Sequence, residues 1–129
     1  LIVTSPPFLN LVDYRKDNWL RCWFNGIEAS RLPLWQFSKE ADWSNAISLV
    51  FAELHRVLKP NGYIAFEVGD LQNGNLLMEN LVVPIALQNG LHPKLIIVNE
   101  HHFTKTSHCW GVKNAKQGTN TNRIVLLQK

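Results

Sequence analysis

Apolar residues recur every three or four positions between residues 42 and 58, which is the spacing of one face of an α-helix. Asp42 suits the N-cap of such a helix, and Pro60-Asn61-Gly62 is a stop signal. The pattern therefore predicts a helix over 42–58. A second helix is predicted from about Asn75 to Gln88, where Pro84 indicates a kink or a shorter helix.

Strands are predicted at residues 1–3, 63–68, 95–98 and 124–127, and three of them are short continuous apolar runs. Continuous runs are typical of strands that helices bury on both faces, so the order strand, helix, strand, helix, strand, strand predicts a layered α/β fold. The last two strands have no helix between them, which favours an antiparallel pair. Residues 104–121 are polar and predict a long loop, and residues 15–41 leave helix and irregular structure open.

Composition adds little to this picture. The chain has 129 residues with 46% hydrophobic and 18% charged positions, which fits one globular domain or part of one. A net charge of +3 permits an anionic partner such as nucleic acid without requiring one. Cys22 and Cys109 form no close pair, so a reducing, cytoplasmic environment is the expectation. No run approaches the length of a membrane span, so no membrane partner is expected.

Two prolines stand directly after the first strand, between a hydroxyl and an aromatic ring. Pro6 and Pro7 form a stiff extended corner without backbone N–H groups. Ser5 adds a hydroxyl that donates or accepts, and Phe8 adds a flat apolar face. The corner either ends the strand, with Phe8 in the core, or accepts hydrogen bonds from a planar amine that stacks on the ring.

Thr4-Ser5-Pro6-Pro7-Phe8 resembles the catalytic motif of DNA amino-methyltransferases, in which Asp, Asn or Ser precedes two prolines and an aromatic residue. The resemblance implies transfer of a methyl group from S-adenosylmethionine to the exocyclic amine of a base. Ser is the residue of the cytosine-N4 group, although some adenine-N6 enzymes carry it too. We therefore expect cytosine N4 ahead of adenine N6 as the target.

Two further stretches resemble methyltransferases that use S-adenosylmethionine. Residues 54–64 are similar to their helix–turn–strand segment, with Asn61 where Gly is frequent, and residues 122–129 are similar to the antiparallel last strand. The resemblance implies one partial catalytic domain over 1–129: a three-layer Rossmann-like sheet comprising strands four to seven, mostly parallel, with an antiparallel last strand and without the cofactor-binding half.

The resemblance also implies roles for the corner residues. The Ser5 hydroxyl and the Pro6 carbonyl would accept the two amine hydrogens, Pro7 would complete the corner, and Phe8 would stack on a base flipped out of double-stranded DNA. Thr4 and Ser5 would also border the cofactor. No covalent intermediate is implied, because no Pro-Cys nucleophile pair is present.

The family's glycine-rich cofactor turn is missing, since no Gly-x-Gly occurs in the 129 residues. We expect the missing half, N-terminal or permuted, to act as a partner, because residue 1 already lies inside a strand. This chain alone should then bind S-adenosylmethionine poorly. The sequence does not indicate an oligomeric state, a recognition site, or whether a restriction–modification system is involved.

Basic residues of the predicted loop, with Trp110 among them, suit contact with DNA phosphates and bases. Residues close behind the corner are further candidates, so the predicted nucleic-acid-binding set is Lys105, Lys113, Lys116, Arg123, Tyr14 and Arg15. A solvated loop is an equally good interpretation. His101, His102, His108 and Cys109 match no common metal spacing, so no metal is expected.

Two alternatives remain. Similar motifs occur in methyltransferases that act on RNA or on a protein glutamine, but these usually carry Asn or Asp at the position of Ser5. A degenerate, non-catalytic module that binds nucleic acid or a partner chain is the other. An upstream glycine-rich turn in the gene would favour the enzymes.

Overall fold

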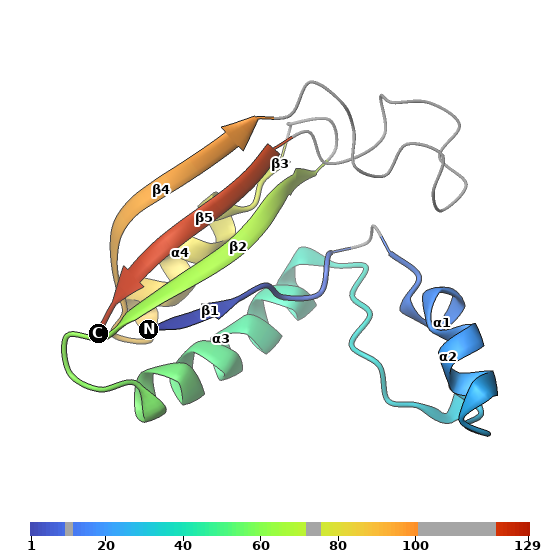
Figure 1. Ribbon diagram of the computed structural model, residues 1–129. Helices are drawn as coiled ribbons and strands as arrows, with labels where there is room; N and C mark the ends of the chain where they lie inside the picture. Colours follow the sequence, from blue (N-terminus) through green and yellow to red (C-terminus); the bar gives the residue numbers. More distant parts are fainter. Residues whose placement is uncertain (10–11, 72–75, 101–120) are drawn as a thin grey trace. The chain divides into compact units, whose positions relative to one another are not determined.

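The computed structural model describes residues 1–9, 12–71, 76–100 and 121–129 (Figure 1). Of Asp70, Leu71 and Glu100 it describes the backbone only. The chain divides into two compact units, and each is described by itself. The first unit comprises Leu1–Pro6 with Ser44–Lys129, and the second comprises Pro7–Trp43.

A mixed sheet organises the first unit. Its strands β1 (Ile2–Thr4), β2 (Tyr63–Leu71), β4 (His92–Glu100) and β5 (Thr121–Gln128) lie in the order β1-β2-β5-β4. β1 and β2 are parallel, whereas β5 is antiparallel to both of its neighbours, β2 and β4. A short strand, β3 (Leu76–Leu77), pairs with the end of β2. The antiparallel last strand is confirmed. The expected mostly parallel sheet is met only in strand direction, since β1, β2 and β4 run the same way. Because β5 lies between β2 and β4, the β1–β2 pairing is parallel, whereas the β2–β5 and β5–β4 pairings are antiparallel.

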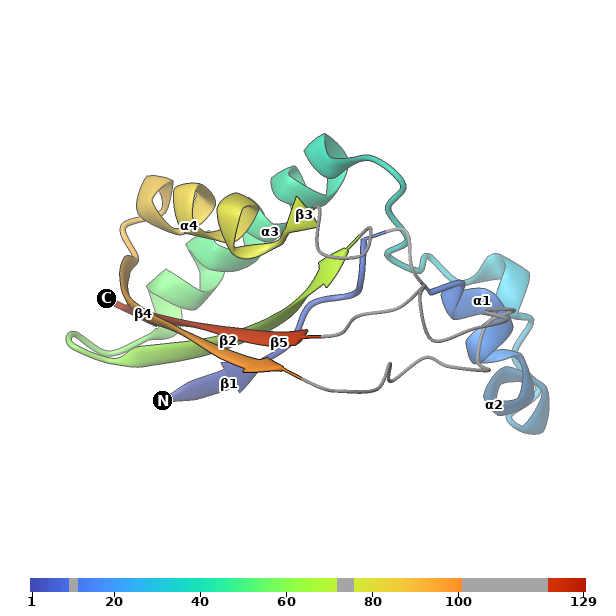
Figure 2. The same ribbon diagram turned by 90° about the horizontal axis from the view of Figure 1, so that it is seen from above.

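Both long helices lie on one face of this sheet. Helix α3 (Glu40–Val57) connects β1 to β2, and α4 (Glu79–Gln88) leads from β2 towards β4 (Figure 2). Both connections join parallel strands and advance across the sheet in the same direction. Right-handed crossovers of that kind place their helices on the same face.

The helices begin differently from the sequence prediction. α3 starts at Glu40, so Asp42 lies in its first turn and is not the N-cap. α4 starts at Glu79 because Leu76 and Leu77 pair with β2 as a strand first. Pro84 lies inside α4, where it has no backbone N–H to donate, and its side chain is exposed.

The core fills the space between the two helices and the sheet. The rings of Phe51 on α3 and Phe66 on β2 pack edge to face, with 4.8 Å between their centroids. The largest fully buried side chains of this unit are Phe51, Phe66, Ile47, Ile64, Leu91, Leu127, Val82 and Val125. Those on β2 and β5, namely Ile64, Phe66, Val125 and Leu127, alternate with residues that point to the other face of the sheet.

The turn between α3 and β2 requires residues of particular shape. Asn61 has φ 61°, the left-handed conformation that Asn tolerates better than most residues, so it replaces the more frequent Gly without breaking the turn. A Cβ on Gly62 would lie 2.7 Å from Leu58 Cγ, so a side chain there would clash. The Lys129 ammonium donates to the carbonyls of His55 and Leu58, at 2.6 and 2.9 Å, and closes the end of α3.

The second face of the sheet differs from the sequence expectation. Continuous apolar runs predicted strands covered on both faces, but no described helix of the first unit covers this one. Leu95, Ile96, Ile97 and Val98 of β4 are all 41–49% exposed. β4 is the last strand of the described sheet, so its side chains lack neighbours on one side as well.

The second unit contains short elements only. These are α1 (Tyr14–Asp17), α2 (Trp19–Phe24) and a 3₁₀ turn over Ala29–Arg31. Trp19, Leu20, Trp23 and Phe24 lie on α2, and residues 32–35 are irregular, so both structures left open for residues 15–41 occur there. These four α2 side chains are all more than half exposed, while Cys22 is buried.

The Phe51–Phe66 contact makes a prediction about stability. Phe51→Ala should lower the free energy of unfolding by about 3–5 kcal/mol, because it leaves a cavity between α3 and β2. Leu49→Ala, at an exposed position of the same helix, is the control and should change it by less than about 0.5 kcal/mol. Urea denaturation of both variants measures the difference. Equal effects would mean that the α3–β2 packing does not carry the core.

Candidate functional site

The proline corner lies at the carboxyl end of the parallel pair of strands. The register Val3↔Ala65 and Thr4↔Phe66 brings the ends of β1 and β2 to the same edge of the sheet. Ligands of open α/β sheets bind at this edge. Thr4 is half-buried, whereas Ser5 comes immediately after the ladder and is exposed. The Ser5 hydroxyl is therefore accessible at the edge where a ligand is expected.

The two proline carbonyls differ in their surroundings. The indole Nε1–H of Trp43 donates to the Pro7 carbonyl at 3.0 Å, and Trp43 is fully buried. Among the described residues, none donates a hydrogen bond to the Pro6 carbonyl. The Pro6 carbonyl can accept a hydrogen bond from a ligand, and the Pro7 carbonyl is already used.

The backbone of Phe8 is held by a hydrogen bond, whereas its side chain is 36% exposed. Its N–H donates to the Tyr14 hydroxyl at 2.8 Å, and its side chain is at the boundary between half-buried and exposed. The alternative in which Phe8 packs in the core is therefore not what the structure shows. Leu9, the next residue, is the buried one.

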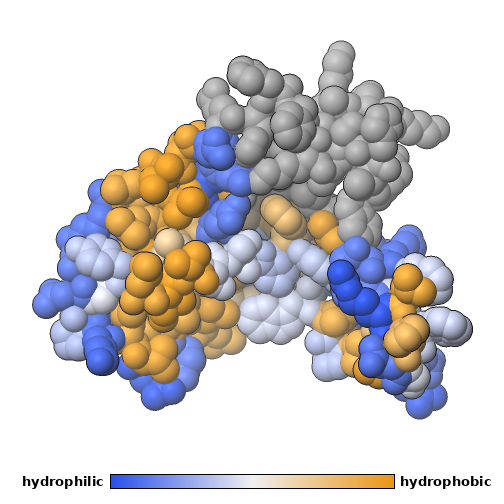
Figure 3. Space-filling model, in the orientation of Figure 1, coloured by the Kyte–Doolittle hydropathy of each residue, from blue (hydrophilic) through white to orange (hydrophobic). Residues whose placement is uncertain are grey.

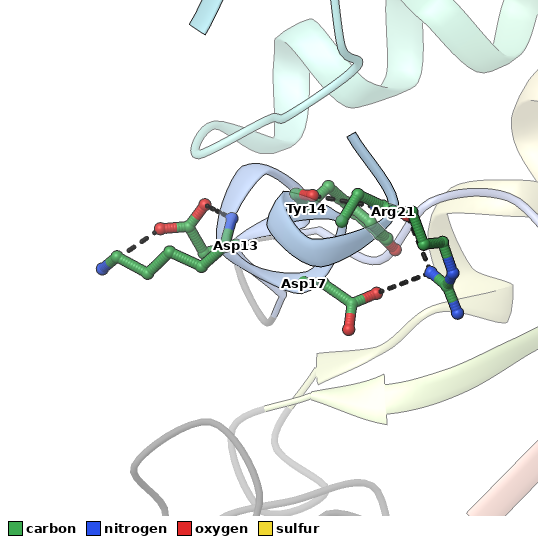
Figure 4. A network of polar contacts seen from close by, with 6 residues as sticks. Asp13, Tyr14, Asp17 and Arg21 are labelled. Atoms are coloured by element: carbon green, nitrogen blue, oxygen red, sulfur yellow. Dashed lines mark hydrogen bonds and ion pairs between the residues drawn. The ribbon is translucent and has the colours of Figure 1, made fainter. Parts of the chain in front are cut away.

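A local network of polar contacts positions Tyr14 (Figure 4). Asp13 caps α1 by accepting from the Lys16 backbone N–H at 3.2 Å, and this hydrogen bond lowers the pKa of the Asp13 carboxyl. Its second oxygen lies 3.2 Å from the Lys16 ammonium. Asn18 donates to the Tyr14 carbonyl at 2.9 Å. Tyr14, a predicted DNA contact, thus holds the Phe8 amide through its hydroxyl.

The remaining predicted nucleic-acid contacts fall into two groups. Lys105, Lys113 and Lys116 lie outside the described residues. Arg15 and Arg123 are described, and both already have protein partners. The exposed Arg15 guanidinium donates to the Ser30 carbonyl at 3.0 Å. A phosphate at Arg15 would have to share its five donors with that carbonyl.

Arg123 forms a buried ion pair with Glu79, the residue that starts α4. Their side chains are only 15% and 9% exposed. Arg123 lies on β5, opposite Val68 of β2 in the register, so the pair connects α4 to β5 beside the carboxyl end of β2. With Nη1 paired to Glu79 and a side chain that is only 15% exposed, Arg123 presents little surface to a DNA phosphate. Sequence reasoning missed Glu79; its signal was an acidic residue at the start of an apolar helix.

The cysteines and the candidate metal ligands lie apart from the corner or outside the described residues. Cys22 is a free, buried thiol in α2, and Cys109 lies outside the described residues, as do His101, His102 and His108. In the described ranges, no three His, Cys, Asp or Glu side chains converge on a point that would hold a metal ion. No helix in those ranges is long and apolar enough to cross a membrane.

The corner presents hydrogen-bond acceptors to a ligand but no extended cradle. Ser5 and the Pro6 carbonyl supply two acceptors, which match two amine hydrogens. A cofactor as large as S-adenosylmethionine needs a cradle along several strand ends, and the described strand ends carry no glycine-rich turn. The described residues therefore do not form a cradle for a ligand of that size.

Comparison with known proteins gives a fold and no family. No protein-family profile matches the sequence, and no curated protein is significantly similar to it. Two solved structures of TTHA0409 from Thermus thermophilus, provisionally assigned as a DNA modification methylase, are similar in fold. The selenomethionine derivative matches with a TM-score of 0.54 and the complex with S-adenosyl-L-methionine with 0.55, both at 18% identity.

The match covers 99% of this chain but only 43–44% of TTHA0409. The 129 residues thus span less than half the length of the protein that they resemble in structure. At this identity the likeness shows the fold alone: a mixed sheet with helices, similar to that of a methyltransferase.

The Tyr14 hydroxyl is expected to hold the corner. Tyr14→Phe removes the partner of the Phe8 N–H, which should cost about 1 kcal/mol and raise hydrogen exchange at the Phe8 amide about fivefold. Tyr63→Phe is the matched control, since Tyr63 is the other tyrosine of the chain and has no such contact. Amide exchange by NMR measures both. Unchanged exchange in Tyr14→Phe would show that the hydroxyl does not support the corner.

Because Glu79 and Arg123 form a buried ion pair, we expect the effects of substituting them on the free energy of unfolding to be strongly coupled. Arg123→Met should destabilise the fold by about 3–5 kcal/mol, because it leaves the Glu79 carboxylate buried without its partner. The double variant Glu79→Leu/Arg123→Met should recover most of this loss. Denaturation of the single and double variants measures the coupling. A double variant as unstable as the sum of the singles would contradict the pairing.

Proposed function

We propose that this chain is the amine-holding part of an S-adenosylmethionine-dependent DNA amino-methyltransferase, with cytosine N4 ahead of adenine N6 as the target. In this assignment β1, β2, β4 and β5 correspond to strands four, five, six and seven of the methyltransferase sheet. The cofactor supplies the methyl group. The chain's own residues hold and orient the nucleophile.

The chemical task is to make a base amine reactive. Its lone pair is delocalised into the ring, so the nitrogen is planar and a poor nucleophile. Hydrogen bonds from its two N–H groups to the Ser5 hydroxyl and the Pro6 carbonyl would draw the nitrogen towards a tetrahedral shape. They would also hold it in one orientation, which reduces the entropy cost of the reaction.

Phe8 supplies the third contact. Its ring would stack on the flipped base, and the Tyr14 hydroxyl would keep the Phe8 backbone in place for that contact. Lys105, Lys113 and Lys116 remain candidates for phosphate contacts on double-stranded DNA. Arg15 and Arg123 are weaker candidates, because each is engaged by a protein group.

The difference between the two proline carbonyls is the observation that carries the proposal. Trp43 occupies the Pro7 carbonyl, while the Pro6 carbonyl and the exposed Ser5 remain as two acceptors at the ligand-binding edge of the sheet. The likeness to TTHA0409, which has been solved with S-adenosyl-L-methionine, supports the same assignment through the fold. Action in the cytoplasm and pairing with a restriction enzyme are extensions of the proposal.

The test is methyl transfer by the protein purified from its own cells. Radiolabelled S-adenosylmethionine and double-stranded DNA are supplied, and the digested nucleosides are separated. We expect N4-methylcytosine, and a loss of at least about a hundredfold in Ser5→Ala. Ser38→Ala is the control, since Ser38 is an exposed serine outside the corner. DNA binding without any methylated base would instead favour a non-catalytic module, and methylated RNA or protein would overturn DNA as the substrate.

A further inference from the structure

The apolar side of α2 points away from its own unit. Trp19, Leu20, Trp23 and Phe24 occupy helix positions i, i+1, i+4 and i+5, which lie within an arc of about 140° around the axis. Cys22, the buried residue of α2, lies on the opposite side of the axis. We call Trp19, Leu20, Trp23 and Phe24 the α2 stripe. Figure 3 shows hydrophobic atoms at the surface of the second unit, at the right of the view, with hydrophilic atoms beside them.

The α2 stripe is exposed along its whole length. Trp19 and Leu20 are 59% and 53% exposed, and Trp23 and Phe24 are 69% and 82% exposed. An amphipathic helix normally turns its apolar side towards the core of its domain, so α2 has the reverse orientation. Exposed apolar patches with a polar surround mark interaction sites, and Trp and Phe are enriched at the centres of protein interfaces. The stripe therefore has the character of an interface centre.

The backbone of α2 is already held in place at both ends. The Cys22 N–H donates to the Asn18 carbonyl at 2.9 Å, and the Ile27 N–H donates to the Cys22 carbonyl at 2.8 Å. Gly26, with φ 67°, adopts the left-handed conformation that ends the helix. A helix fixed in this way loses little conformational freedom on binding, so the stripe is preorganised for a partner.

The charges of the second unit favour a protein partner over DNA. A surface that binds DNA carries an excess of Lys and Arg, because the duplex is densely negative. Between Pro7 and Trp43 the two signs cancel, with five cations and five carboxylates. These are Arg15, Lys16, Arg21, Arg31, Lys39, Asp13, Asp17, Glu28, Glu40 and Asp42. The stripe thus lies in a unit without net attraction for phosphates.

The charges beside the stripe are compatible with a second copy of the same surface. Arg21 lies 3.9 Å from Asp17, just before α2, and Arg31 lies 2.6 Å from Glu28, just after it. The 3₁₀ turn that carries Arg31 packs beside α2. In a two-fold contact with antiparallel helices, each end of one stripe meets the other end of its copy. Each carboxylate then approaches a cation of the partner, whereas a surface of one sign would repel its copy.

The area of the stripe is sufficient for a specific dimer. A fully buried aromatic side chain removes about 150–250 Å² from water, so the exposed parts of the stripe amount to roughly 500 Å² in each copy. Two copies would bury roughly 1,000 Å² through the stripe alone, which is the lower limit for a specific interface. The charged residues at both ends would add to this area.

We propose that the α2 stripe binds the α2 stripe of a second copy of this chain and forms a two-fold symmetric dimer. Trp19, Trp23 and Phe24 are its apolar anchors. The Asp17–Arg21 and Glu28–Arg31 pairs form its polar rim. The proposal does not rest on the proposed function, because it uses no residue of the proline corner.

Sedimentation velocity of the tagged protein isolated from its own cells tests the proposal, without DNA or cofactor and over a range of concentrations. We expect twice the mass of one chain at micromolar concentration. Leu20→Glu places a charge in the stripe and should raise the Kd of the dimer at least about thirtyfold. Leu49→Glu is the matched control, since Leu49 is an exposed leucine of another helix, and should change the Kd by less than about twofold.

Crosslinking gives a second measurement that does not require a destabilising charge. Phe24→Cys replaces the most exposed residue of the stripe, and Leu49→Cys is its control. With a flexible bismaleimide, Phe24→Cys should form covalent dimers at least about tenfold faster than Leu49→Cys, because the dimer raises the effective concentration of the two thiols. The parent protein under the same conditions gives the background from the native cysteines.

Three results would overturn the proposal. The first is a protein that stays monomeric at all concentrations, including one in which Phe24→Cys is shielded from maleimide by another segment of its own chain. The second is a dimer that Leu20→Glu does not weaken and Phe24→Cys does not crosslink. The third is a Leu20→Glu variant that keeps the dimer but loses DNA binding. Association is measured without methyl transfer, so a dimer without methylation would remove only the proposed function, and a methylating monomer only this proposal.

Discussion

The packing of α3 against β2 through Phe51 and Phe66 is the contact on which the candidate site depends. β1 has only three residues, and its one described partner strand is β2. A strand so short is stable only beside a neighbour that is itself held in place. By burying Phe66, α3 holds β2, and β2 in turn holds the end of β1, from which Ser5 and Pro6 extend.

Polar contacts then set the details that packing leaves open. Trp43 occupies the Pro7 carbonyl and Tyr14 holds the Phe8 amide, so the backbone on the far side of the corner is satisfied by protein groups. On the near side, no described residue donates a hydrogen bond to the Pro6 carbonyl. Glu79 and Arg123 join α4 to β5 beside the end of β2. Arg123 therefore has a structural role in the fold.

Several expectations from sequence were met because they depend on local chemistry. The three- and four-residue spacing of α3, the stop at Asn61-Gly62 and the apolar runs of β2 and β5 all express preferences of neighbouring residues. The same reasoning failed for β4. Leu95 to Val98 predicted a strand covered on both faces, but coverage depends on elements far away in the chain, or beyond the described residues. Tyr14 and Arg123 were predicted to contact DNA from their residue type and position in the chain. Their observed partners are the Phe8 N–H and the Glu79 carboxylate, and these contacts depend on how the chain folds.

The sequence by itself determined the types of β1, β2, β4, β5, α3 and α4, the antiparallel end of the sheet and the position of a hydroxyl–proline–aromatic corner after a strand. These follow from periodicity and backbone restriction. Only the tertiary structure decided the strand order, the shared face of α3 and α4, and which proline carbonyl accepts from Trp43. The physical reason is that each of these depends on a long-range contact: Phe51 with Phe66, β5 between β2 and β4, and Trp43 with a residue 36 positions away.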